Sequence, residues 1–173
     1  SPLGDARSSV PENRATWILE DRAGDVWIGS NRASGRWSRA RPETTRLENL
    51  GSSVQSIVED PTGRVWMGTV DQGLFYSRDG SMVPFPDPTL KTEIIRSIAI
   101  DLEGQVWVGS NVRLRRYGAD WKLRETYFEN VQFNALLVDS HGILWAATHK
   151  LGLLRIEKNQ AAALAGTELP FVT

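Results

Sequence analysis

Few side chains in this sequence have the types and spacing that catalysis needs. The two histidines are His141, which lies inside an Asp-x-x-Gly turn, and His149. The paired acids Glu20-Asp21 and Glu59-Asp60 are neighbours in the sequence. Adjacent residues of a strand point to opposite faces, so each pair makes a poor general acid and base. The sequence has no cysteine, no Glu-x-x-His motif and no glycine-rich phosphate loop. We therefore expect no enzyme activity, no metal site and no cofactor.

The aspartates belong instead to a ten-residue pattern that occurs four times. It contains Asp, two residues, Gly, one residue, Val or Leu, Trp, an apolar residue, a small residue, and Ser or Thr. The steps from one Asp to the next are 39, 41 and 38 residues. A repeat of about 40 residues indicates propeller blades if it consists of strands, and a solenoid if it consists of helices. The four copies are residues 21–30, 60–69, 101–110 and 139–148.

The residues around each aspartate favour strands. A short apolar run precedes each Asp and another follows each Gly, such as Ile57-Val58 and Val65-Trp66-Met67 in the second copy. Two such runs joined by Asp-x-x-Gly predict a hairpin, in which the carboxylate accepts backbone N–H bonds and Gly takes a positive φ. A calcium role is the weaker alternative, because the residues between Asp and Gly supply no consistent set of oxygens. The predicted turn residues are Asp21, Asp60, Asp101, Asp139, Gly24, Gly63, Gly104 and Gly142.

The second strand of each hairpin carries a tryptophan. Alternate side chains of a strand share a face, so each Trp shares one face with the Gly or Ala two residues later. Val or Leu lies on the other face. Both faces are thus apolar, which is typical of a sheet that is covered on both sides. We predict that these tryptophans form the core between neighbouring sheets. They are Trp27, Trp66, Trp107 and Trp145.

The second repeat resembles a known family. Ser56-Ile57-Val58-Glu59-Asp60, then Gly63, Val65-Trp66-Met67-Gly68-Thr69 and Gly73-Leu74-Phe75-Tyr76 are similar to the repeat of the two-component regulator propellers. Two related patterns fit less well, because sialidase-type Asp boxes place Gly two residues after Asp and quinoprotein-dehydrogenase repeats place Trp four residues after Gly. The resemblance implies β-propeller sensor domains of bacterial membrane receptors, and its four copies cover residues 14–173.

We therefore expect an all-β fold of four blades, each a four-stranded antiparallel sheet. In blade 1, we place the third strand at 35–40 and the fourth at 45–48. In blade 4, Leu169–Val172 repeats the pattern of Val83–Pro86 and is the predicted fourth strand, with one helical turn at Ala161–Ala165. The predicted parts are a linker or arm at 1–13, then blades at 14–50, 51–92, 93–130 and 131–173.

The composition argues against nucleic acid and membranes as partners of this segment. The net charge of −1 gives no general attraction to nucleic acid, and no apolar run is long enough to span a membrane. The first residues, Ser1–Asp5, lack the organisation of a signal peptide, as in an excised or matured segment. The basic runs 36–41 and 113–116 are interpreted as solvated blade edges.

The candidate ligand site follows from propeller geometry. The loop after the second strand and the start of the first strand lie on the same side of the disc, and the repeats differ there. Differences confined to one side of a fixed scaffold are typical of recognition, although plain solvent-exposed loops are the alternative. Amide, carboxylate and guanidinium groups together suit hydroxyl-rich or anionic molecules. The candidates are Gln55, Asp71, Arg96, Asn111, Asn134 and His149.

The expected function is that of a non-catalytic ligand-sensing segment. The resemblance implies a periplasmic receptor coupled to a histidine kinase or a nucleotide cyclase, and a small molecule or oligosaccharide as ligand. One alternative is a propeller-based lyase or hydrolase, and another is a purely structural module that dimerises or transmits strain. We expect no direct membrane insertion of this segment. Uncovered outer faces of blades 1 and 4 predict a homodimer, or packing against further blades of the parent protein.

Overall fold

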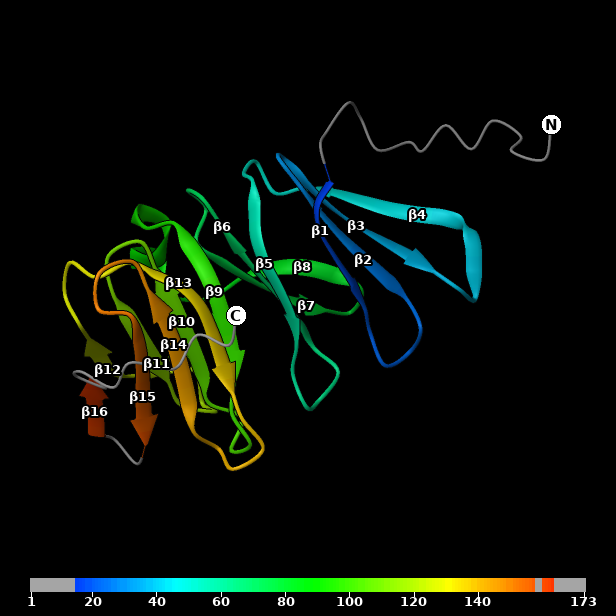
Figure 1. Ribbon diagram of the computed structural model, residues 1–173. Coiled ribbons are helices and arrows are strands. Elements are labelled where there is room, and N and C mark those ends of the chain that lie inside the picture. The colour runs from blue at the N-terminus through cyan, green and yellow to red at the C-terminus, as the bar shows by residue number, and fades with distance from the viewer. Residues whose placement is uncertain (1–14, 158–159, 164–173) are drawn as a thin grey trace, which may run out of the picture. The chain divides into compact units, whose positions relative to one another are not determined.

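The computed structural model describes residues 15–157 and 160–163. These residues form four four-stranded antiparallel sheets, and in each sheet the strands follow the order of the chain (Figure 1). The predicted fold class, an all-β array of propeller blades, is confirmed. We call the sheets blades 1 to 4 in chain order. The chain divides into two compact units, one up to Ile95 and one from Arg96 onward.

The first unit contains blades 1 and 2. Its strands are β1 (Ala15–Glu20), β2 (Val26–Ser30), β3 (Ala33–Ser38), β4 (Arg41–Asn49), β5 (Val54–Glu59), β6 (Val65–Thr69), β7 (Leu74–Arg78) and β8 (Ser81–Pro84). Their buried side chains join the two sheets in one core: Trp27, Leu50, Val54, Ile57, Val65, Met67 and Phe75.

Blades 1 and 2 meet through a close approach at Gly29. A Cβ at this residue would lie 2.7 Å from Cγ1 of Val54, closer than real contacts allow. Gly29 shares a face with Trp27, two residues earlier on the same strand. The face of blade 1 that carries the tryptophan therefore covers the face of blade 2 that carries Val65. We call these two sides of a blade its Trp face and its Val face.

The second unit repeats this packing with blades 3 and 4, although Ile95, the first residue of β9, still belongs to the first unit. Its strands are β9 (Ile95–Ile100), β10 (Val106–Ser110), β11 (Leu114–Tyr117), β12 (Leu123–Tyr127), β13 (Phe133–Val138), β14 (Leu144–Thr148), β15 (Leu153–Glu157) and β16 (Gln160–Ala163). Ala99 and Trp107 on the Trp face of blade 3 join Leu144 and Ala146 on the Val face of blade 4. Gly109 permits the contact, because a Cβ there would lie 2.9 Å from that of Phe133.

The end of blade 4 differs from the sequence-based expectation. Residues 161–163, expected in a helical turn, belong to strand β16, which pairs with β15 from Glu157↔Gln160 to Leu154↔Ala163. The helix propensity of alanine is weak compared with pairing to an adjacent strand edge. The predicted strand Leu169–Val172 lies outside the described residues.

Blade 1 also differs in its strand limits, since β3 begins earlier and β4 is longer than expected. A one-turn 3₁₀ helix, η1 (Pro88–Thr92), was not anticipated. Its start has a local cause, because the carboxylate of Asp87 accepts the N–H of Thr89 at 3.0 Å and Pro88 follows the cap. The buried side chain of Leu90 anchors it.

Candidate functional site

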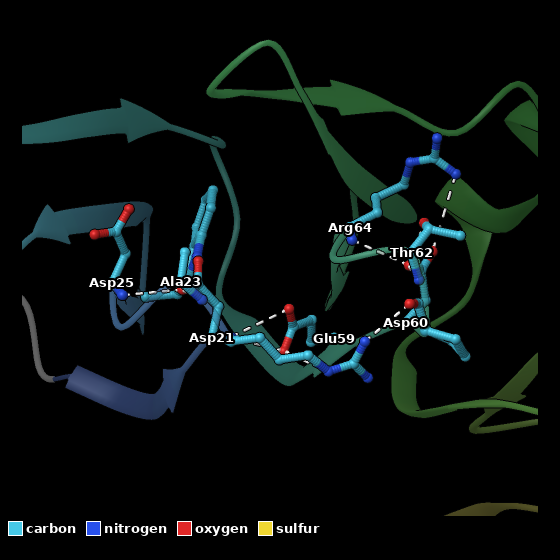
Figure 2. A network of polar contacts seen from close by, with 10 residues as sticks. Asp21, Ala23, Asp25, Glu59, Asp60, Thr62 and Arg64 are labelled. Atoms are coloured by element: carbon cyan, nitrogen blue, oxygen red, sulfur yellow. Dashed lines mark hydrogen bonds and ion pairs between the residues drawn. The ribbon is translucent and has the colours of Figure 1, made fainter.

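Each aspartate of the repeat holds both its own turn and the following tryptophan. In blade 2, Oδ1 of Asp60 accepts the backbone N–H groups of Thr62 at 2.8 Å and Arg64 at 3.0 Å. Its Oδ2 accepts the indole N–H of Trp66 at 2.9 Å. Figure 2 shows this turn beside that of blade 1. The same indole-to-carboxylate bond joins Trp27 to Asp21 (2.7 Å), Trp107 to Asp101 (3.1 Å) and Trp145 to Asp139 (2.8 Å).

The carboxylates of this network are already occupied by protein donors. Each Oδ1 accepts two backbone N–H groups and each Oδ2 accepts one indole, as in Asp139 with His141, Ile143 and Trp145. The glycine of each turn has a positive φ of 75–84°. In the described part of the chain, no group of three or more His, Asp or Glu residues is arranged to hold a metal ion.

Hydrogen bonds shift the acidity of these aspartates. Burial raises the pKa of Asp60, but bonds from Thr62, Trp66 and the backbone of Arg64 outweigh it and hold the pKa below its ordinary value. The indole of Trp145 and the backbone N–H of Ile143 lower the pKa of Asp139 likewise.

This shift predicts that folding stability falls in acid. A carboxylate with a lower pKa in the folded state stabilises the fold above its unfolded pKa of about 4, and this contribution is lost as the pH falls further. Thermal melts from about pH 7 to about pH 3 measure it. We expect Asp60→Asn to be less stable at neutral pH and to lose less stability in acid than the parent. Identical pH profiles for the two proteins would contradict the role assigned to Asp60.

Glu59 links the turns of blades 1 and 2 rather than serving as an acid or base. Its carboxylate accepts the backbone N–H of Arg22 at 3.1 Å, and the guanidinium of Arg22 donates to the carbonyl of Pro61 at 2.8 Å (Figure 2). The acids Glu59 and Asp60 thus have separate structural partners.

In the first unit, the candidate ligand residues Gln55 and Asp71 are bonded to the segment before β5. The amide nitrogen of Gln55 donates to the hydroxyl of Ser53 at 3.2 Å, and the backbone N–H of Asp71 donates to that of Ser52 at 3.2 Å. The side chain of Asp71 is exposed. The two candidates are therefore placed by two adjacent serines, Gln55 by Ser53 and Asp71 by Ser52.

In the second unit, Gln132 connects two of the remaining four candidates. Its side chain donates to Oδ1 of Asn134 at 2.7 Å, and its carbonyl accepts the N–H of His149 at 3.0 Å. Both side chains are exposed. Arg96 lies on β9 with a buried Nε that has no hydrogen-bond partner within the described residues, and Asn111 follows β10.

Two arginines stack on the repeated tryptophans and were not predicted from the sequence. Strand pairing places Arg36 opposite Trp27 and Arg116 opposite Trp107. Each guanidinium lies over its indole ring, at 5.3 and 5.5 Å from the centroid. The interpretation of the basic runs as solvated edges is wrong for Arg116, whose side chain is 13% exposed and pairs with Glu125. Arg36 stays partly exposed and pairs with Asp25. The spacing of nine residues from each Trp to its Arg was the available signal.

Comparison with known proteins supports the blade architecture. The model of the two-component regulator propeller matches residues 9–32 and 50–71. No curated protein matches the chain. The extracellular domain of a putative one component system from B. thetaiotaomicron is 18% identical, with a TM-score of 0.69 over 84% of this chain and 21% of that one.

Two further solved structures have the same fold. The extracellular domain of a putative hybrid two component system from B. thetaiotaomicron is 23% identical, with a TM-score of 0.67 over 83% of this chain and 22% of that one. A virginiamycin B lyase from Staphylococcus aureus is 16% identical, with a TM-score of 0.71 over 87% of this chain and 55% of that one. The chain thus spans between about a fifth and just over half of these proteins.

The fold and the repeated Asp–Trp turns define a segment of a β-propeller. Two of its segments, 9–32 and 50–71, match the two-component regulator propeller repeat that the resemblance indicated. No helix in the described residues is long and apolar enough to cross a membrane.

Proposed function

We propose that this chain is a non-catalytic ligand-sensing segment of a bacterial signal-transduction receptor, located in the periplasm. The observation that carries the proposal is the family match to the regulator propeller repeat. Two similar folds belong to extracellular domains of one-component and hybrid two-component systems, which supports the same location and role.

Each blade has a shared structural end and a variable polar end, which supports a binding role. The Asp–Trp hydrogen bond and the turn are common to all four repeats, whereas the opposite ends of the strands carry different polar residues. A rigid scaffold with differing polar groups at one end is suited to recognition rather than to chemistry. We assign ligand contact to the candidates within each unit, Gln55 and Asp71 in the first and Arg96, Asn111, Asn134 and His149 in the second. The ligand that we propose is a carbohydrate.

A ligand would act on the receptor by favouring one arrangement of the parent protein over another. Binding shifts such an equilibrium only by the difference in affinity between the two arrangements. Hydroxyl groups of a sugar match the amides of Asn134 and Gln55, which both donate and accept hydrogen bonds. A guanidinium such as that of Arg96 adds charge-assisted donors for an acidic sugar.

The test is a calorimetric screen of oligosaccharides against the protein and a double variant, Arg96→Ala with Asn134→Ala. We expect a bound sugar to lose at least about tenfold in affinity in the double variant, since two polar contacts are removed. Lys122→Ala with Arg124→Ala is the control and should bind as the parent does. Lys122 ends the turn between β11 and β12, and Arg124 lies at the start of β12. Binding that survives the loss of Arg96 and Asn134 would place the ligand elsewhere.

A lyase activity is the second candidate function, and the fold of the virginiamycin B lyase is the observation that favours it. The direct test is incubation of the protein with virginiamycin B, followed by mass spectrometry. We expect the antibiotic to remain intact. Its conversion to a product that separates from it by liquid chromatography before the mass spectrometer would overturn the non-catalytic assignment.

A further inference from the structure

The first unit contains a groove at the end of the strands where the Asp-x-x-Gly turns lie. It has a volume of about 380 Å³. Trp27 and Arg36 of blade 1 form one side, and two turns of blade 2 form the other, at 62–64 and 77–80. The candidate ligand residues of the proposed function belong to the opposite ends of the strands, so the groove is a separate feature.

Arginines supply the groove with positive charge and hydrogen-bond donors. Arg36 is anchored, because its Nε donates to Oδ2 of Asp25 at 2.9 Å and its Nη2 contacts the same oxygen. Its Nη1 makes no hydrogen bond to a described residue and lies 3.6 Å from the position of a Cβ on Gly80, at the groove wall. Arg78 is exposed, and its side chain has no ion pair or hydrogen bond with the described part of the chain.

Arg64, which pairs with Asp60 at 3.9 Å, and Ser77 also line the groove. Arg64 lies over the rings of Trp66 and Tyr76, at 6.0 and 5.5 Å from their centroids, and lines the groove. The hydroxyl of Ser77 accepts the N–H of Val65 at 2.9 Å, which leaves its own hydrogen to donate. Asp79 is the one acid among the described residues that line the groove.

The second unit has a groove in the same place. Residues shared by the two grooves belong to the common fold, and residues that differ are candidates for recognition. That groove, of about 550 Å³, again contains the stacked pair Trp107 and Arg116. Strand register and position in the turn identify the equivalent residues of the two grooves. In the second unit, the residues equivalent to the polar donors are of other types. Arg64, Ser77 and Arg78 correspond to Ile143, Ile156 and Glu157.

Because the second unit forms the same two-blade core without these groups, the fold does not require them. Guanidinium groups whose donors the described residues do not take up attract anions, and Arg forks match carboxylate, sulfate and phosphate oxygens. The volume is that of a small-molecule site.

We propose that this groove binds a small molecule bearing oxyanion groups, which Arg36, Arg78 and Ser77 hold through donated hydrogen bonds. Arg64 adds positive charge beside them. The groove is a second site, distinct from the sugar site of the proposed function, and either can exist without the other.

The test is titration of the ¹⁵N-labelled protein with inorganic phosphate, sulfate and citrate at low ionic strength, followed by NMR. We expect shifts at 77–80 and at the indole of Trp27, with the ranking of the three anions showing which oxyanion is preferred. Arg78→Gln should weaken binding about tenfold, the loss of one charge-assisted contact. Arg64→Ile, the residue found in the second unit, should fold and weaken binding as well.

Arg124→Gln is the matched control, because Arg124 is an exposed arginine of the other unit and pairs with Asp120 at 2.8 Å. It should bind all three anions as the parent does. Absence of shifts in the groove, or an equal loss of affinity in Arg78→Gln and Arg124→Gln, overturns the proposal. The latter result would mean that anions respond only to overall charge.

Discussion

Replacing Trp66 by alanine is expected to lower the free energy of unfolding by about 3–5 kcal/mol, the range for large core deletions. The side chain is 1% exposed, and its ring lies 5.7 Å from that of Tyr76 and 5.8 Å from that of Phe85. The change removes this packing and also leaves Oδ2 of Asp60 without its indole donor. Trp107→Ala should cost a similar amount, since Trp107 is buried and stacks on Tyr127 at 6.0 Å.

Two further variants separate packing from hydrogen bonding. Trp66→Phe keeps most of the ring but removes the donor, and an unsatisfied buried carboxylate oxygen costs about 1–3 kcal/mol. Trp145 makes the same bond to Asp139 but is only half-buried, so Trp145→Ala should cost less than Trp66→Ala. Chemical denaturation of the four variants measures these differences. Melting curves of Trp66→Ala that overlay those of the parent would mean that the ring is not part of the core.

The blades could be predicted from the sequence because their signals are local. Asp60 and Gly63 form one turn, and Trp66 lies six residues after the aspartate that it contacts. Repetition of this short pattern at a near-constant step fixes the number of sheets without any knowledge of contacts between them. Even so, the sequence suggested only that Asp60 accepts backbone N–H groups, and the indole bond was not foreseen.

The groove of the first unit could not be predicted in this way, because it depends on register. Arg36 meets Trp27 only because β2 and β3 pair with these residues opposite each other. The cationic side of the groove combines turns from blade 2 that are more than ten residues apart in sequence. The helical turn expected at 161–163 was wrong for a related reason, since pairing at the edge of β15 overrides the local preference of these alanines.

The second large effect expected is self-association of the isolated protein. The Val face of blade 2 is covered by blade 1, and Ile57 on it is 6% exposed. The equivalent residue on blade 1 is Ile18, which is 73% exposed. Its neighbours Val26 and Ile28 correspond to the fully buried Val65 and Met67 but are only half-buried. The Val face of blade 1 is therefore exposed, although it carries the same types of apolar residue as the covered Val face of blade 2.

Blade 4 presents the complementary surface. Its Trp face carries Leu137, which is 63% exposed, and Trp145, which is half-buried. Their counterparts on blade 3, Ala99 and Trp107, are buried in the core of the second unit. A Trp face on a Val face is the packing that occurs within each unit, so the blade 4 face of one copy fits the blade 1 face of another. Under twofold symmetry the contact occurs twice and closes.

We therefore expect light scattering to give a mass above the 19.3 kDa of one chain, rising to that of a dimer with concentration. Ile18→Glu should shift the protein toward the monomer, because a charge buried without a partner opposes the contact. Leu102→Glu is the control: Leu102 is 74% exposed but lies in the turn after Asp101, outside both faces, and its replacement should leave the mass unchanged.

A monomer of the parent protein with a cooperative melt at all concentrations would contradict dimerisation. A monomer that binds a further blade supplied in trans would instead favour a longer parent chain as the source of the cover. The two results are distinguishable because only dimerisation responds to Ile18→Glu in the absence of any added protein.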